Sequence, residues 1–152
     1  MVKKIINNTG LFYLLQFTWG LAMNIIGALV FAFLIIFRKK QVKKYHSHFY
    51  IVVGKTEWGG LNLGLFFLVD KTEHLVHKYH EAGHGLQNIV YGPLFPFLVA
   101  IPSAIRYHYR NYRIKKGLGN KNRYSDIWFE KQADEWGFKY YVAPYLRQQY
   151  EI

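Results

Sequence analysis

The sequence contains no cysteine among its 152 residues. A disulfide framework and a thiolate metal site are therefore both excluded. Acidic residues are also scarce, with nine Asp and Glu against 20 Lys and Arg. Any transition metal that this chain holds firmly must bind histidine nitrogens and carboxylate oxygens, and seven histidines are present to supply the nitrogens.

Charge is absent from Leu11 to Phe37. A helix over this run would be about 40 Å long, which exceeds the hydrocarbon core of a bilayer at about 30 Å. The run is longer than the apolar part of a signal peptide, and no small-residue cleavage site follows it. We therefore predict an uncleaved transmembrane anchor in residues 1–44. A buried hydrophobic hairpin, broken near Gly20 or Gly27, is the alternative.

Basic residues follow both apolar parts of the chain, at 38–44 and again at 106–123, and the net charge is +11. Attraction to anionic lipid headgroups explains both groups with one cause. The larger excess after the anchor predicts that the domain in residues 45–152 lies on the cytoplasmic side of the membrane. Aromatic residues make up 19% of the chain, which suits a protein at a membrane interface. Nucleic-acid binding is the rival explanation, but no recognition module is present, and we expect no nucleic-acid partner.

The segment His80-Glu81-Ala82-Gly83-His84 has the pattern H-E-x-x-H. On a helix, residues four apart share a face, so the His80 and His84 rings can reach one ion. A catalytic zinc ion leaves one position open for water, and Glu81 beside it could take the proton of that water. A polar helix with solvated histidines is the alternative.

A second pattern, E-x-x-x-D, follows in Glu130-Lys131-Gln132-Ala133-Asp134. One helix face offers only two ligands, so a third must come from elsewhere, and Glu130 could supply an oxygen. Asp134 lies one helical turn later, where it could accept a hydrogen bond from a ligand histidine and fix its tautomer. Taken alone, this pattern also fits a solvated helix face.

The two motifs in this order resemble the gluzincin type of zinc metallopeptidase. They are similar in particular to its membrane-embedded CAAX-prenyl-peptidase-like and heat-shock-protease-like members, which are much longer than this chain. The resemblance implies that His80, His84 and Glu130 bind Zn²⁺, that Glu81 is the general base, and that Asp134 orients a ligand. It does not supply a matched residue for stabilising the transition state.

Alternation of apolar residues predicts strands at Phe49–Val53 and Leu61–Val69, joined as a hairpin by the turn at 54–60. The edge of this hairpin could pair with an extended peptide, with Asn62 and Gly64 as the candidate contacts. A hairpin that only packs against the rest of the protein is equally consistent with the pattern.

A capping box of Asp70 and Glu73 predicts the start of the H-E-x-x-H helix, and Gly92-Pro93 predicts its end. Its apolar stripe should face the core, with the metal-binding side opposite and His77 at the rim of a cleft; the stripe comprises Leu75, Tyr79, Ala82, Leu86 and Ile89.

Three of the four prolines interrupt the apolar segment 89–105, which excludes a regular spanning helix there. We predict a re-entrant or interfacial segment, with an ordinary buried loop and helix as the alternative. A helix at Ile105–Ile114 and a surface loop at 115–123 should follow. The last helix should start at a Ser125 cap and end at Pro144, with Gly137 close to the zinc helix.

The fold class that these elements predict is α+β and zincin-like, in the order transmembrane helix, β-hairpin, H-E-x-x-H helix, proline-interrupted segment and E-x-x-x-D helix. The expected function is hydrolysis of peptide or protein substrates at a membrane. Three residues are chemically able to stabilise the oxyanion, namely His108, Tyr124 and Tyr141, and Tyr124 is preferred. The alternative is a membrane-anchored binding or scaffold protein that keeps the fold without turnover.

Overall fold

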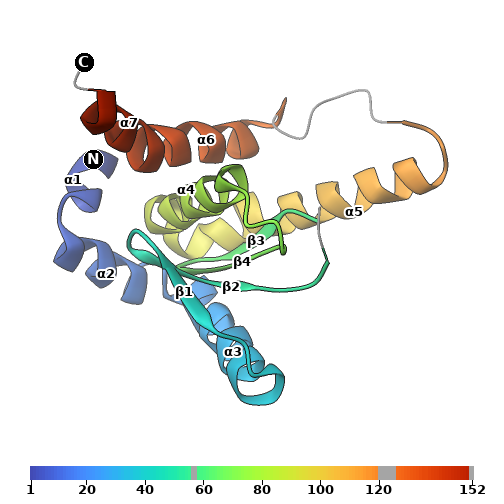
Figure 1. Cartoon of the computed structure of the whole chain (residues 1–152), viewed down its shortest axis with the longest axis horizontal. Coiled ribbons are helices and arrows are strands. Elements are labelled where there is room, and N and C mark those ends of the chain that lie inside the picture. The colour runs from blue at the N-terminus through green and yellow to red at the C-terminus, as the bar shows by residue number, and fades with distance from the viewer. Residues whose placement is uncertain (56–57, 120–125, 151–152) are drawn as a thin grey trace.

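The computed structural model describes residues 1–55, 58–119 and 126–150 and shows an α+β fold around a four-stranded sheet (Figure 1). Before the sheet come α1 (Val2–Ile6), α2 (Thr9–Phe17) and α3 (Leu21–Arg38). The strands are β1 (Val42–Tyr45), β2 (His48–Val52), β3 (Gly60–Leu63) and β4 (Phe66–Val69). After them come α4 (Leu75–Tyr91), η1 (Gly92–Leu94), η2 (Pro96–Ala100), α5 (Ile101–Lys115), α6 (Trp128–Gly137), η4 (Phe138–Val142) and α7 (Ala143–Tyr150).

Helices lie on both faces of the sheet. Alternate side chains of each strand point to opposite faces, so each face packs against its own layer of helices. On one face, Ile51 and Leu68 pack with Phe31 of α3. On the other face, Asn62 donates a hydrogen bond to the backbone oxygen of Glu81 in α4. Figure 1 shows α3 below the sheet and α4 and α6 above it.

The strand order is β1-β2-β4-β3, which corrects the predicted hairpin. Residues 61–69 form two strands, not one, because Gly64, with a φ of +80°, allows a tight turn between β3 and β4. The strand at 48–52 then pairs with β4 in parallel, not as an antiparallel hairpin partner. Residues 42–45, which were expected to flank the anchor, form β1 and pair with β2.

The uncharged run is also not one helix, because it breaks at residues 18–20 between α2 and α3. Of the two helices, α3 is long and apolar enough to cross a membrane, and only 22% of it is buried. Its buried residues follow one stripe, from Met23 and Gly27 to Phe31, which faces the sheet. A helix near the N-terminus with these properties is also compatible with a signal sequence or a core helix.

Three buried amides join the two N-terminal helices to α4. The Oε1 atom of Gln16 accepts hydrogen bonds from Nδ2 of Asn24 at 3.0 Å and of Asn88 at 2.9 Å. Gln16 also donates to the backbone oxygen of Gly85 at 3.1 Å, and Oδ1 of Asn24 accepts from the Leu65 amide at 2.6 Å. The break between α2 and α3 is therefore part of the packed fold.

The H-E-x-x-H helix starts at Leu75, and no side chain caps it. The predicted capping box is wrong because Asp70 binds the backbone amides of Gly59 and Thr72, while Glu73 pairs with Lys43 at 2.6 Å. Leu75 of the predicted stripe is exposed and Tyr79 is half-buried, whereas the later apolar positions of the stripe from Ala82 onward are buried. The predicted end at Gly92 is confirmed.

The proline-interrupted segment is largely helical, and its axis turns by 118° between α4–η1 and η2–α5. Pro102 lacks an N–H group, and a π-helical turn before it carries the bond from Ile101 N–H to Pro96 O. Pro144 has the same arrangement, with Ala143 N–H bound to Phe138 O. Pro144 therefore does not end the last helix, as predicted, but lies within one helical rod from Trp128 to Tyr150.

Helices α4 and α6 cross closely because two glycines lie at their contact. A Cβ atom on Gly83 would overlap the Ala133 carbonyl, and one on Gly137 would overlap the Tyr79 carbonyl. The predicted close approach at Gly137 is confirmed. It brings the H-E-x-x-H face and the E-x-x-x-D face together. The predicted cap at Ser125 lies outside the described residues.

Asn24→Leu tests whether the N-terminal helices unfold together with the rest of the protein. The predicted division at residue 44 would instead make them a separate anchor. The variant leaves the buried Leu65 N–H without its acceptor, so we expect a loss of about 1–3 kcal/mol in unfolding free energy, measured by thermal unfolding in detergent. Asn7→Leu, at an exposed position, should change it by less than about 0.5 kcal/mol. Equal stability of the two variants would contradict this packing.

The buried His48 should make the fold sensitive to acid. Burial, with a smaller contribution from His46, lowers the pKa of His48 to about 3. Above pH 6.5 the His48 imidazole is neutral in both the folded and the unfolded state. Below pH 6.5 it becomes protonated in the unfolded chain but stays neutral in the folded one, so the free energy of unfolding falls between pH 6.5 and about 3. When the pH is lowered from 7 to 5, the free energy of unfolding of His48→Leu, measured by chemical denaturation, should fall by about 2 kcal/mol less than that of the wild type. His108→Leu, at an exposed position, should keep the wild-type slope, and a wild-type slope in His48→Leu would refute the prediction.

Candidate metal centre

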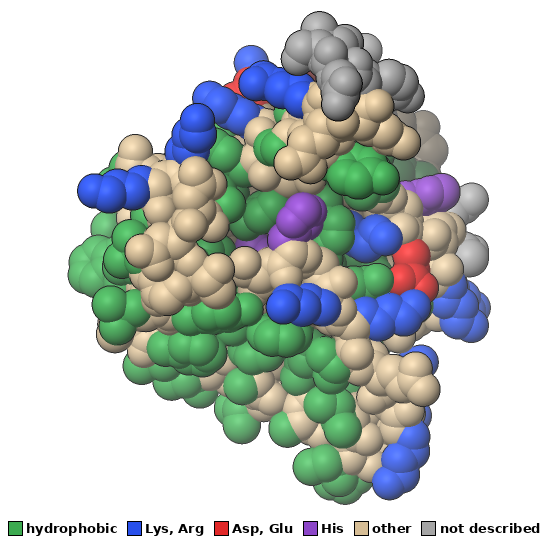
Figure 2. Space-filling model, turned by 60° about the vertical axis from the view of Figure 1, so that its left-hand side comes forward, with side chains coloured by type: hydrophobic (Ala, Val, Ile, Leu, Met, Phe, Trp, Pro, Cys, Tyr) green, Lys and Arg blue, Asp and Glu red, His purple; other side chains and the backbone are tan. Residues whose placement is uncertain are grey.

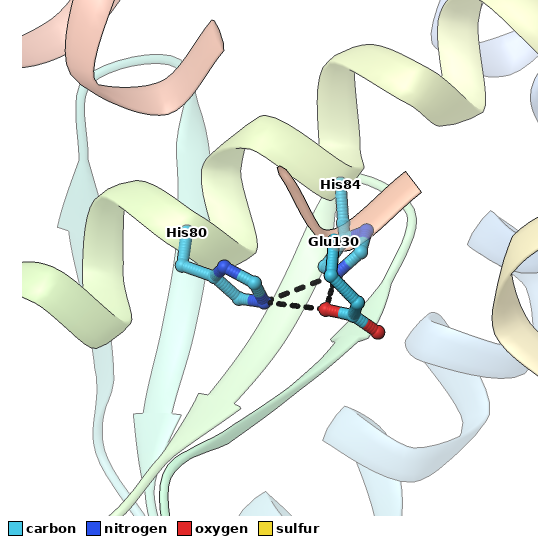
Figure 3. A group of neighbouring side chains, drawn as sticks. All are labelled: His80, His84 and Glu130. Carbon is cyan, nitrogen blue, oxygen red and sulfur yellow. Dashed lines mark hydrogen bonds and ion pairs between the residues drawn. The ribbon is translucent and has the colours of Figure 1, made fainter. Parts of the chain in front are cut away.

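Two histidine nitrogens and one carboxylate oxygen meet at a single point between α4 and α6 (Figure 3). The Nε2 atoms of His80 and His84 are 3.1 Å apart, and Oε2 of Glu130 lies 3.1 Å from the first and 3.3 Å from the second. Bonds of about 2.1 Å to a tetrahedral ion place neighbouring ligand atoms about 3.4 Å apart. The three atoms are therefore spaced to share one metal ion.

The outer nitrogens of both rings face hydrogen-bond acceptors. Nδ1 of His80 lies 2.7 Å from Oδ1 of Asp134, and Nδ1 of His84 lies 2.7 Å from Oε1 of Gln87. When each Nδ1 carries the ring proton, each Nε2 presents a lone pair to the shared point. Asp134 thus lies where the sequence predicts an orienting residue, and Gln87 holds the second ring.

The orientation of the Gln87 amide follows from its other contacts. Its Nε2 donates to the backbone oxygen of Phe129 at 2.8 Å and to Oε1 of Gln132 at 2.9 Å, and Gln132 also accepts from the Tyr91 hydroxyl at 2.7 Å. A backbone carbonyl can only accept, so the Gln87 nitrogen must face it and the oxygen must face His84. Gln87 therefore connects one ligand to the residue that precedes Glu130.

Electrostatics favour positive charge at the shared point. Burial alone would lower the pKa of His80, but Asp134 and Glu130 outweigh it and raise that pKa to about 10. Burial would raise the pKa of Glu130, but the two adjoining imidazoles hold it well below its usual range. Ser103 donates to the second oxygen of Glu130 at 2.5 Å and leaves Oε2 to face the rings. A proton or a metal ion could supply the charge that the three groups attract.

Glu81 is buried beside the same cavity, under the edge of the sheet. A Cβ atom on Gly60 of β3 would lie 2.5 Å from its Oε1, so glycine leaves the space that this carboxylate occupies. Burial raises the pKa of Glu81 despite the nearby histidines. A carboxyl group with a raised pKa is suited to exchange protons near neutral pH.

The cavity next to these residues has a volume of about 650 Å³. Its apolar wall includes Trp58, Leu61, Phe95 and Val99, while its polar lining includes His77, His108, Arg110 and Asn111 as well as the site residues. Strand β3 forms one side, and α5 forms another. The arrangement can accommodate a partly apolar ligand that reaches the three convergent atoms.

The three expected oxyanion donors lie in different places. His108 is exposed and lines the cavity. Tyr141 is wrong for this role, because its ring is buried among Tyr45, His46 and His48 in another part of the protein. Tyr124 lies outside the described residues.

The two residues that were predicted to contact a peptide at the edge strand, Asn62 and Gly64, form hydrogen bonds within the protein. The Asn62 amide donates to Gly64 O and Glu81 O, and its oxygen accepts from Gly64 N at 2.8 Å, so this pair holds the β-turn against α4. Strand β3 is nevertheless at the edge of the sheet, and its residues Gly60–Asn62 line the cavity. His77 also lines the cavity, and its Nδ1 atom lies 3.6 Å from Oδ2 of Asp70.

Two residues that hold the site were missed in the sequence. Gln87 follows His84 by three residues and so shares its helix face, a spacing that could have indicated it. Ser103 lies in the apolar segment, distant in sequence from Glu130, and no local pattern predicts that contact.

Gln87→Leu should lower zinc affinity about 10- to 100-fold, because His84 loses the acceptor that fixes its tautomer. Competition with a chromogenic chelator measures this effect. Gln148→Leu, at an exposed position, is the control and should bind as the wild type does. Unchanged affinity in Gln87→Leu would show that this amide does not orient the ring.

Comparisons with protein-family models, with curated proteins and with solved structures find no match for this chain.

Proposed function

We propose that this protein is a membrane-anchored zinc metallopeptidase that hydrolyses peptide bonds with water activated by Glu81. The observation that carries the proposal is the convergence of three acceptor atoms, two Nε2 and one Oε2, at spacings of 3.1–3.3 Å. Two imidazoles and one carboxylate are a donor set typical of catalytic zinc. The resemblance to gluzincins implies the same ligands.

The residues around the three ligands have distinct tasks in this mechanism. Asp134 and Gln87 keep each Nδ1 protonated, so that both Nε2 lone pairs face the metal position. Bound zinc supplies a Lewis acid that polarises a carbonyl group and acidifies water. Glu81 takes the proton of the attacking water and delivers it to the leaving amine.

Substrate binding is assigned to the edge of β3. An extended peptide could pair with the backbone near Leu61, whose side chain is exposed, and direct its scissile bond toward Glu81. The apolar cavity wall favours apolar side chains in that peptide. His108 lines the cavity, which supports it as the group that stabilises the oxyanion. Tyr124, which the sequence favours for this role, lies outside the described residues.

Membrane anchoring is assigned to α3 as a single pass, with the catalytic part on the cytoplasmic side. The apolar outward side of α3 and the basic residues from Arg38 to Lys44 support this assignment. It places the peptidase beside anionic headgroups and beside substrates at the bilayer surface.

Glu81→Gln should keep zinc at the wild-type ratio and lower hydrolysis of a fluorogenic peptide mixture by about 10²- to 10⁴-fold, because only the proton acceptor is lost. His84→Ala is the matched comparison and should lose zinc and activity together. Normal hydrolysis by Glu81→Gln would exclude this residue as the base. Zinc binding without hydrolysis in the wild type would favour the scaffold alternative.

A further inference from the structure

The bend between α4 and α5 exposes a group of large apolar side chains that the proposed peptidase mechanism does not use. We name it the apolar bend, comprising Leu94, Phe97, Leu98, Ile101 and Ile105. Phe97 is 68% exposed, Ile105 is 63% exposed and Leu94 is 59% exposed. Soluble proteins rarely expose contiguous apolar groups of this kind without a partner.

The apolar bend is continuous with the outward side of α3. A Cβ atom on Gly92 would overlap the Trp19 indole, so the start of the bend touches the turn that leads into α3. Phe95 and Val99, on the inner side of the bend, pack with Met23 of α3. Both elements therefore contribute to one surface, and Figure 2 shows hydrophobic side chains gathered over the lower part of the molecule down to the end of α3.

The outward side of α3 is apolar along its length. Its exposed large residues are Leu21, Ile25, Ile26, Leu29, Phe33, Ile35, Ile36 and Phe37. The sheet covers the opposite side of this helix, so only this outward side is open to a partner.

Charge identifies that partner as a lipid bilayer. Residues 89–105 contain no charged side chain. Of the cations that follow, Arg110 lines the cavity, whereas Lys115 and Lys116 are exposed at the end of α5. In the same way, α3 is uncharged up to its last residue, Arg38, and Lys39 and Lys40 follow it. An apolar surface bordered by cations matches hydrocarbon bordered by anionic headgroups, whereas a second copy of this chain would bring like charges together.

The backbone of the bend is suited to lipid. Pro93, Pro96 and Pro102 have no N–H group that hydrocarbon would leave unpaired, and the π turn pairs Ile101 N–H with Pro96 O. The axis turns by 118° between the two helices, as it does in a broken span or a re-entrant loop. We infer that the apolar bend is a second membrane-inserted element, a re-entrant turn that lies beside α3 in the same leaflet.

The inner side of the same bend supplies Phe95, Val99 and Ser103 to the cavity wall. The bend therefore forms part of the wall between the three convergent atoms and the proposed lipid-facing surface. The inference rests on the proposed membrane anchoring by α3 but not on zinc binding or hydrolysis.

The absence of cysteine makes site-specific labelling direct. An environment-sensitive NBD label is attached to one introduced cysteine at a time, in the variants Phe97→Cys, Leu94→Cys, Phe33→Cys and Glu135→Cys. Each labelled protein is placed in vesicles of phosphatidylcholine and phosphatidylglycerol, with or without nitroxide-labelled lipid. Phe33 reports the outward side of α3. Glu135 is the matched control, since its side chain is 62% exposed on α6, on the other side of the sheet from α3.

We expect nitroxide lipid to quench the labels at 94 and 97 within about twofold of the label at 33, with blue-shifted emission and no quenching by aqueous iodide. The label at 135 should be quenched by aqueous iodide and not by nitroxide lipid, and its emission should not be blue-shifted. If the labels at 94 and 97 are quenched by iodide like the one at 135, or are shielded from both quenchers as beneath a second protein, the inference is wrong. If the label at 33 also fails to meet lipid, the proposed anchor is wrong as well.

Discussion

The requirement for a positive charge at one buried point dominates this structure. His80 and His84 present lone pairs toward the same position, and Glu130 adds a carboxylate oxygen within 3.3 Å of both. Three acceptors so close together repel one another unless a cation lies among them. Gln87, Asp134 and Ser103 hold the three groups there, so the surrounding hydrogen bonds stabilise an arrangement that is unfavourable without a bound proton or metal.

The fold supplies this convergence through close helix packing. Gly83 and Gly137 remove the side chains that would separate α4 from α6. On the other side of α4, the amides of Gln16, Asn24 and Asn88 fix the helix to α2 and α3. The N-terminal helices thus hold the helix that carries His80 and His84, and they also present an apolar surface. A membrane attachment through α3 would hold the site at a set distance from lipid.

Sequence patterns predicted the parts of the site that depend on helix periodicity. The spacing of His80 and His84, and of Glu130 and Asp134, determines which side chains share a face, and the structure brings both faces together. Patterns failed where tertiary contacts decide the outcome. Residues 61–69 alternate as one strand, yet Gly64 turns them back, and Asp70 binds Gly59 and Thr72 rather than capping α4. The Gln87 amide and the Ser103 hydroxyl form hydrogen bonds to residues of α6, and local sequence patterns do not show that α6 packs beside them.

X-ray absorption at the zinc edge reports the atoms bound to the ion, so it shows whether His80, His84 and Glu130 form a zinc centre. With one zinc per chain, we expect scattering from two imidazoles together with oxygen ligands, all at about 2.0–2.2 Å. The imidazole signal should drop to one ring in His80→Ala or His84→Ala that has been forced to bind zinc at excess metal. Three or more imidazoles, or zinc bound with no imidazole at all, would contradict the assignment of this centre.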